Sequence, residues 1–218
     1  MNIAFDLEGT LTTGRTWKGV GSFLAQHGRG MPYRAFFITR LPGSLLARIG
    51  LLDGQNFGNQ WIIDLARLMR GFGVQQLEEM AEWVVQREMW PHRRLDIMAE
   101  MQRHKEAGQR IILASGTYLP IANAFARRAG ITSVIGTPLA VREGRALGRL
   151  AGPLNVKGVK AERLNVMLAG ESLDMAYGDT LADVPMLQMA TTAVAVYPDK
   201  RLRKIAKEKR WRILAEPE

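Results

Sequence analysis

The stretch N-I-A-F-D-L-E-G-T-L-T, residues 2–12, decides how this chain folds. A short, mainly apolar run leads to the carboxylate of Asp6, and the pair Gly9-Thr10 follows shortly after. An apolar run of this length that ends at a turn predicts a buried β-strand. We therefore expect a strand over residues 2–6 that carries Asp6 at its carboxyl end.

The same pattern recurs later in the chain, and helical patterns separate the repeats. Further strands are predicted at residues 111–114, 173–177 and 193–196, with an edge strand at 211–214. Helices are predicted at residues 91–107, 119–129, 159–168 and 183–189. This alternation predicts an α/β fold with a Rossmann-like parallel-sheet core and helices on both faces. Ligands of such sheets bind beyond the carboxyl ends of the strands.

Two segments interrupt the alternation. Residues 14–88 contain no convincing strand and predict several helices, with turns at 27–28, 41–43, 53–54 and 71–73. Residues 138–150 predict two short strands around the turn Glu143-Gly144.

Four short segments carry side chains that handle phosphate: FDLEGTLT at 5–12, ILASGT at 112–117, KAERL at 160–164 and GDTLADVPML at 178–187. They supply a nucleophilic carboxylate, a hydroxyl, a cation and a pair of metal-binding carboxylates. This inventory suits phosphoryl transfer through an aspartyl-phosphate. Taken singly, each residue has an ordinary explanation as a turn, a helix-terminal acid or a surface group. Their common position at predicted strand ends favours one site.

Within this set we assign expected roles from the chemistry. Asp6 is the candidate nucleophile. The Ser115 hydroxyl and the Gly116 N–H would bind phosphoryl oxygens, and Lys160 would neutralise their charge. Lys157, three residues upstream, is an alternative cation.

The order and spacing of the four segments resemble the haloacid dehalogenase superfamily of Mg²⁺-dependent phosphohydrolases, in the branch of phosphoserine phosphatase. The resemblance extends from residue 2 to about residue 214. It implies a catalytic core of residues 1–13 and 89–218 and an all-helical cap of residues 14–88. It also implies Mg²⁺ bound directly by Asp6, Asp179 and the Glu8 backbone carbonyl, with Asp183 either as a further ligand or as a partner through water. Oxygen ligands are those that Mg²⁺ prefers.

Glu8 departs from the superfamily pattern, in which phosphatases normally carry aspartate two residues after the nucleophile. That residue protonates the leaving oxygen and then deprotonates water. A minority of relatives, including a phosphoserine–homoserine phosphotransferase, share the D-L-E-G stretch. We therefore expect Glu8 to be the acid–base group, and the acceptor, water or an alcohol, stays open.

The cap sequence is basic and apolar. Residues 10–51 contain no Asp or Glu, whereas phosphoserine phosphatase uses an early cap glutamate to bind the substrate's amino group. Arg15 is the candidate substrate-binding residue here, and we expect a substrate without an ammonium group. The apolar run at 36–52 would either face a lipid phosphate or membrane interface, or pack against the Ile62 and Leu65 helix. We favour the packed core.

Composition limits the remaining classes. The net charge is +9, but the arginines are scattered and no nucleic-acid-binding signature appears, so we do not expect nucleic acid as a partner. The chain has no cysteine, which excludes disulfides and thiolate chemistry. We see no secretory signal and no apolar run of ~18 residues. We expect a cytoplasmic protein and make no prediction of its oligomeric state.

The sequence thus predicts a Mg²⁺-dependent phosphomonoester hydrolase, acting through an aspartyl-phosphate on a small or lipid-like phosphorylated metabolite. Two alternatives stay open. One is a phosphotransferase that uses an alcohol as acceptor, and the other is a catalytically weak protein that binds an anionic ligand.

Overall fold

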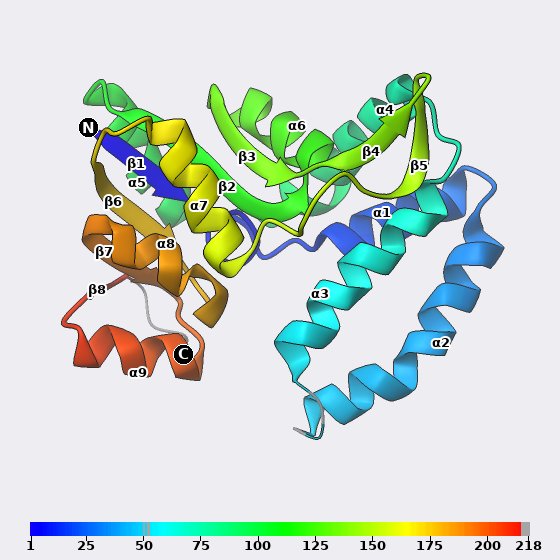
Figure 1. The fold of residues 1–218 in the computed structure, drawn as a ribbon, viewed down its shortest axis with the longest axis horizontal. Helices are drawn as coiled ribbons and strands as arrows, with labels where there is room; N and C mark the ends of the chain where they lie inside the picture. Colours follow the sequence, from blue (N-terminus) through cyan, green and yellow to red (C-terminus); the bar gives the residue numbers. More distant parts are fainter. Residues whose placement is uncertain (50, 52, 215–218) are drawn as a thin grey trace.

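A computed structural model of the chain describes residues 1–49, 51 and 53–214. At its centre lies a six-stranded sheet with the order β3-β2-β1-β6-β7-β8, and every pair of neighbouring strands is parallel (Figure 1). The predicted α/β class is confirmed. The strands are β1 (Asn2–Phe5), β2 (Arg110–Tyr118), β3 (Ser133–Thr137), β6 (Leu173–Gly178), β7 (Ala190–Val196) and β8 (Arg212–Leu214).

Helices cover both faces of the sheet, and the alternation of side chains along β1 explains why. Ile3 and Phe5 belong to one apolar cluster and Ala4 to another, because successive residues of a strand point to opposite faces. The first cluster includes residues of α5 (Leu95–Glu106) and α6 (Leu119–Ala129). The second includes residues of α7 (Lys157–Leu168), α8 (Val184–Met189) and α9 (Lys200–Glu208).

The register of the central strands decides what meets at their carboxyl ends. Phe5 pairs with Leu113 on one side and with Tyr177 on the other. Asp6 therefore leaves the sheet level with Gly178, at the end of β6, and level with Ala114 of β2, one residue before Ser115. This register brings three of the four motif segments together.

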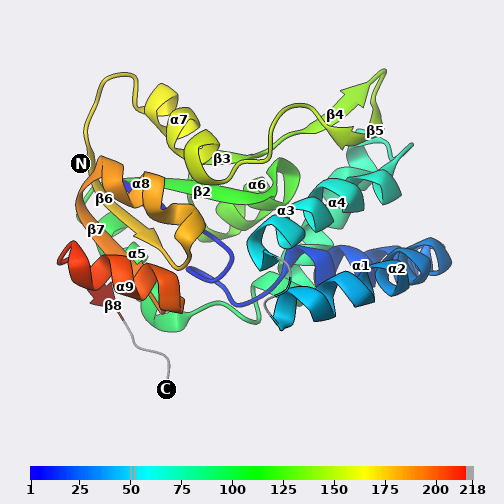
Figure 2. The same cartoon turned by 60° about the horizontal axis from the view of Figure 1, so that its bottom comes forward.

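The chain between β1 and α5 forms helices beside the sheet (Figure 2). The helical prediction for this segment is confirmed. The predicted hairpin is also confirmed, as β4 (Leu139–Arg142) and β5 (Arg145–Leu150). The helices are α1 (Thr16–Gln26), α2 (Gly30–Arg48), α3 (Gly54–Leu65), the 3₁₀ turn η1 (Ala66–Met69), α4 (Val74–Val84) and the π-helical turn η2 (Val85–Met89).

Besides shifts of a few residues at the ends of several elements, the following features differ from the predictions. The turn predicted at 41–43 lies inside α2, where Pro42 is exposed, so the Ile38 carbonyl that loses its helical partner stays near water. The helix predicted from residue 91 begins at Leu95, because Arg93 bridges to Thr12 and the Arg94 N–H donates to the Leu11 carbonyl. Strand β3 was not predicted at all.

The apolar run at 36–52 is only partly buried, so its prediction as packed core is partly wrong. Phe36 and Phe37 contact Trp61, with ring centroids 5.6 and 5.7 Å away. Leu45 and Ile49 are each 61% exposed, because only one side of α2 is covered by its neighbours α1 and α3. Residues 50 and 52 of this run lie outside the described residues. None of the helices in the described ranges is long and apolar enough to cross a bilayer.

Candidate active site

Three carboxylates meet where β1 and β6 end. Asp6 follows β1, Asp179 follows β6, and Asp183 closes the 3₁₀ turn η3 (Leu181–Asp183). One oxygen of each lies within 4.8 Å of the others, and Asp6 and Asp183 are buried. The fold thus concentrates negative charge at a single buried point.

Lys160, at the start of α7, is the cation that faces this cluster. Its Nζ donates to Asp6 Oδ1 at 2.7 Å and to Asp183 Oδ1 at 2.6 Å, and the side chain is 2% exposed. Burial alone would lower the pKa of Lys160, but Asp183 and Asp6 outweigh it and raise the pKa, so the ammonium stays charged. Lys157 is exposed and lies outside the cluster. The geometry therefore selects Lys160 over Lys157.

The carboxylates nevertheless outnumber their cation. Burial raises the pKa of Asp6 to about 7, even though Lys160 opposes the shift. Burial and the neighbouring Asp183 also raise the pKa of Asp179 well above its usual range. Both shifts have the same physical origin, since burial and a like-charged neighbour disfavour the ionised form of a carboxyl group. The donor set, all carboxylate oxygen, fits a hard divalent cation.

The loop after β1 is shaped around Asp179. Gly9 has a φ of +103°, and a Cβ built there would lie 1.9 Å from Asp179 Oδ2. Thr10 Oγ1 donates to Asp179 Oδ1 at 3.3 Å. On the other side, Asp183 Oδ2 accepts from the Asp179 and Thr180 N–H groups, which fixes the turn after β6. Only glycine allows the loop to approach this closely.

Ser115 lies in β2 where the pairing with β3 shifts register between Ala114 and Tyr118. Its Oγ accepts from the Thr117 N–H at 3.2 Å. Asn155, fully buried, donates from Nδ2 to the Ser115 carbonyl at 2.8 Å and so holds this segment in place. Sequence analysis did not identify Asn155, because it stands alone in a loop without a periodic pattern.

Glu8 is held by α1, the first helix after β1. Its Oε1 accepts a hydrogen bond from Thr16 Oγ1 and a second, of 3.2 Å, from the Thr16 N–H. Thr16 Oγ1 is also hydrogen-bonded to Thr117 Oγ1. Burial raises the pKa of Glu8 although Thr16 and Arg15 oppose it. Sequence analysis did not identify Thr16 and Thr117 as site residues, because threonines next to a motif carry no distinct pattern.

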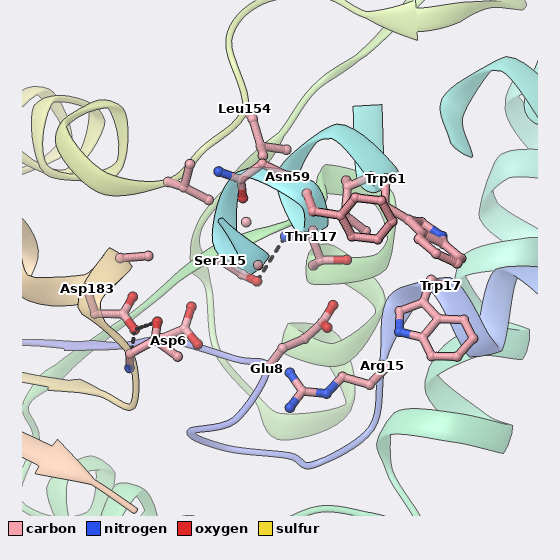
Figure 3. Close-up of a pocket in the computed structure, with 18 of the residues that line it drawn as sticks. Asp6, Glu8, Arg15, Trp17, Asn59, Trp61, Ser115, Thr117, Leu154 and Asp183 are labelled. Atoms are coloured by element: carbon pink, nitrogen blue, oxygen red, sulfur yellow. Dashed lines mark hydrogen bonds between the residues drawn. The ribbon is translucent and has the colours of Figure 1, made fainter. Parts of the chain in front are cut away.

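A cavity of about 700 Å³ opens onto this chemistry. In Figure 3, Asp6 and Asp183 lie at one end, Glu8 and Arg15 lie in the middle, and Trp17 and Trp61 lie at the other end. The cavity is lined by the predicted site residues except Asp179, which lies beside Gly9 and Thr10. Arg15 is exposed, and its guanidinium lies near the Glu8 carboxylate.

The sequence model of one family, described as haloacid dehalogenase-like hydrolase, matches residues 3–188. The chain belongs to the haloacid dehalogenase-like hydrolases. The match begins in β1 and ends in α8, so it contains all four phosphate-handling segments.

Relatives of this haloacid dehalogenase-like hydrolase include proteins named as phosphatases. Phosphoserine phosphatase SerB1 of Mycobacterium tuberculosis is 32% identical over 226 residues, which cover 96% of this chain and 68% of that protein. A histidinol-phosphatase of Neisseria meningitidis is 37% identical over 147 residues, which cover 63% of each. The chain is thus an enzyme of the haloacid dehalogenase phosphatase type.

A solved structure shares the fold over nearly the full length. A Bordetella pertussis protein of unknown function superimposes with a TM-score of 0.81 at 25% identity, covering 98% of this chain and 97% of that one. The sheet of this haloacid dehalogenase-like hydrolase and its helical segment therefore recur together in a second protein.

Proposed function

We propose that this chain hydrolyses small phosphomonoesters with the help of Mg²⁺ and through an aspartyl-phosphate formed on Asp6. The observation that carries the proposal is the buried cluster of Asp6, Asp179 and Asp183 around Lys160, at the end of a cavity deep enough to admit an ester. A carboxylate at this point is close to a cation and to hydroxyl and amide donors, as phosphoryl transfer requires.

In this proposal Asp6, Asp179, Asp183 and the Glu8 carbonyl hold Mg²⁺. When bound, the ion supplies the positive charge that lets an anionic carboxylate approach an anionic phosphate. Ser115 and the Gly116 N–H donate to the phosphoryl oxygens, and Lys160 neutralises charge on the phosphoryl group and on Asp6. Ser115 and Gly116 belong to β2, which pairs with β1, and Lys160 belongs to α7.

The reaction then has two steps, formation of the aspartyl-phosphate and its hydrolysis. A carboxylate oxygen of Asp6 forms a bond to phosphorus, the P–O bond of the ester breaks, and the leaving oxygen takes a proton from Glu8. Glu8 next accepts a proton from water, whose oxygen bonds to phosphorus, and the bond to Asp6 breaks to release inorganic phosphate. The raised pKa of Glu8 supports the first role, since a carboxylic acid must hold its proton to donate it.

We assign residues 14–88 to a cap over this site and residues 1–13 and 89–218 to the catalytic core. The cap contributes Arg15 and the aromatic end of the cavity, and Thr16 connects it to the acid–base residue. Closure of such an element excludes water and completes the site.

Phosphate release tests the proposal directly. We expect the purified protein to release inorganic phosphate from at least one member of a phosphomonoester panel with Mg²⁺, and to lose that activity with EDTA. Excess Mg²⁺ should restore it. Adding a simple alcohol in the same assay tests the alternative acceptor, since a transferase would form a new ester in place of phosphate. Unchanged turnover in EDTA would contradict the proposed metal dependence.

Thr16 offers a second test, because it connects Glu8 to the cap. In Thr16→Val the hydroxyl that donates to Glu8 is lost, and we expect kcat to fall about 10-fold, a fraction of the ~10²–10⁴ that a proton shuttle contributes. The limb of the pH–rate profile that belongs to Glu8 should also move to higher pH, since the Thr16 hydrogen bonds lower the pKa of that carboxyl.

Thr13→Val is the matched control. Thr13 is exposed, and its hydroxyl donates only to the His92 carbonyl among the described contacts. We expect an unchanged pH profile for this variant. Equal effects of the two substitutions on the pH profile would exclude a positioning role for Thr16.

A further inference from the structure

The cavity continues past Glu8 into a chamber walled by aromatic rings from α1, α2 and α3 (Figure 3). Trp61 is its centre: its ring centroid lies 5.7 Å from those of Trp17, Phe37 and Phe57. These contacts hold the rings against one another, so the chamber is formed before any ligand enters. We call Trp17, Phe37, Phe57 and Trp61 the aromatic chamber.

Residues of the proposed catalytic core also contribute apolar side chains to the lining of this cavity. Leu154 and Val156, from the loop before α7, also line the cavity, and a Cβ built at Gly116 would lie 3.0 Å from Val156 Cγ1. A phosphoryl group held by Ser115 and Lys160 therefore directs its ester oxygen toward Glu8 and the rest of the ester toward aromatic and aliphatic walls.

The carboxylates that line the cavity all have partners outside the aromatic chamber, so the chamber itself has no negative charge among the described residues. Asp6 and Asp183 are bonded to Lys160, and Glu8 is bonded to Thr16. Asp199 Oδ1 accepts the Leu202 N–H and caps α9. The residues that line the aromatic chamber in the described part of the chain include no carboxylate.

Nearby charges would also oppose a cation. Asp64, on α3, is already bonded to Arg40 and Arg67. The Lys18 ammonium lies 5.7 Å from the Trp17 ring centroid, and Arg15 lines the cavity next to it. Aromatic cages bind alkylammonium groups when they are free of competing cations. Here a cation already faces the chamber's edge, so a substrate ammonium would be desolvated without a partner.

We infer that the aromatic chamber binds the uncharged, apolar part of the substrate, so that the preferred substrates are phosphomonoesters of apolar alcohols and not of amino alcohols. This inference rests on the proposed phosphatase function and names the substrate class for the same site. Burial of the apolar group supplies binding free energy at a distance from the reacting bond, where it helps to orient the ester for attack by Asp6.

A series of alkyl esters tests this class. Ethyl, butyl, hexyl and 2-phenylethyl phosphate share an aliphatic C–O–P bond and differ in what the chamber contacts. We expect kcat/KM to rise about threefold per added methylene, or about 100-fold from ethyl to hexyl phosphate. O-Phosphoserine, phosphoethanolamine and phosphocholine should be used less well than hexyl phosphate, by a similar factor.

Substitutions in the chamber should change selectivity. In Phe57→Ala we expect the ratio of kcat/KM for hexyl over ethyl phosphate to fall about 10-fold, and Trp61→Ala should lower it further. Phe57→Glu should shift the preference toward phosphoethanolamine, because it adds the missing counter-charge. Trp83→Ala, an aromatic deletion in α4 outside the cavity, is the matched control and should keep the wild-type ratio.

The outcomes distinguish a failure of the inferred substrate class from a failure of the proposed phosphatase function. Metal-dependent hydrolysis of all esters with equal kcat/KM for ethyl and hexyl phosphate would leave the phosphatase intact and overturn the inference. Preference for phosphoserine or phosphocholine would also overturn it. Absence of turnover on every ester, with Mg²⁺ and an intact fold by circular dichroism, would overturn both.

Discussion

Asp6→Asn is expected to lower kcat by about 10⁴-fold or more, the range seen when a covalent nucleophile is removed. The amide keeps the size of the side chain and can still accept a hydrogen bond from Lys160, but it cannot form the aspartyl-phosphate. The measurement is phosphate release from the best ester of the panel, with wild type and variant at equal Mg²⁺.

The same substitution is expected to stabilise the protein in the absence of metal. The folded pKa of Asp6, about 7, lies above the 3.8 of an unperturbed aspartate. Between these pH values the folded state holds a proton that the unfolded chain has lost, so the free energy of unfolding decreases as pH rises through this window. Asparagine does not ionise. Asp6→Asn should therefore have a higher Tm than wild type above pH 7 in EDTA.

This pair of results separates a catalytic loss from misfolding. A variant that is inactive and more stable has lost a functional group and not its fold, as expected where function requires clustered charge. Substantial activity in Asp6→Asn would contradict the assignment of the nucleophile. A lower Tm at high pH would contradict the charge balance described for the cluster.

Lys160→Met is expected to have the second largest effect. The substitution removes the cation that is bonded to Asp6 and Asp183 and leaves both carboxylates buried without it. We expect kcat to fall about 10³-fold, as for loss of one charge-stabilising donor. Breaking a buried ion pair from one side also costs about 3 kcal/mol of unfolding free energy. Phosphate release and urea unfolding in EDTA measure the two effects.

Lys157→Met is the control for this variant. Lys157 is exposed and begins the same helix, so the change in charge and side chain is identical, but no contact with the cluster is lost. We expect its unfolding free energy within about 0.5 kcal/mol of wild type. If Lys157→Met lost activity and Lys160→Met kept it, the choice between the two lysines would be reversed.

The sequence was most informative where strands end. The runs before Asp6 and before Gly178 and Asp179 were predictable, because a buried parallel strand is continuously apolar and its end carries the polar residues. β3 escaped prediction because Ser133 and Gly136 interrupt its apolar pattern, and its pairing with β2 compensates for them. Pattern alone thus found the centre of the sheet and its edge strand β8, but not the opposite edge strand, β3.

The partners of the site residues were not predictable. Thr16 and Asn155 contact Glu8 and Ser115 only because α1 and the loop before α7 fold back over the sheet. Such contacts depend on tertiary packing, which a local pattern does not contain. The exposed apolar residues of α2, including Leu41 and Leu45, show the same limit, since helical periodicity alone does not reveal how much of a helix is covered.

Trapping of the phosphorylated enzyme tests the central claim most directly. Glu8→Ala should slow hydrolysis of the aspartyl-phosphate more than its formation when the ester has a good leaving group such as a phenol. The protein would be mixed with ester and Mg²⁺, quenched in acid and digested, and its peptides analysed by mass spectrometry. We predict a phosphoryl group on Asp6, removed by hydroxylamine and absent from Asp6→Asn. Steady phosphate release with no phosphoryl group on Asp6, or with the group on Ser115, would contradict the mechanism.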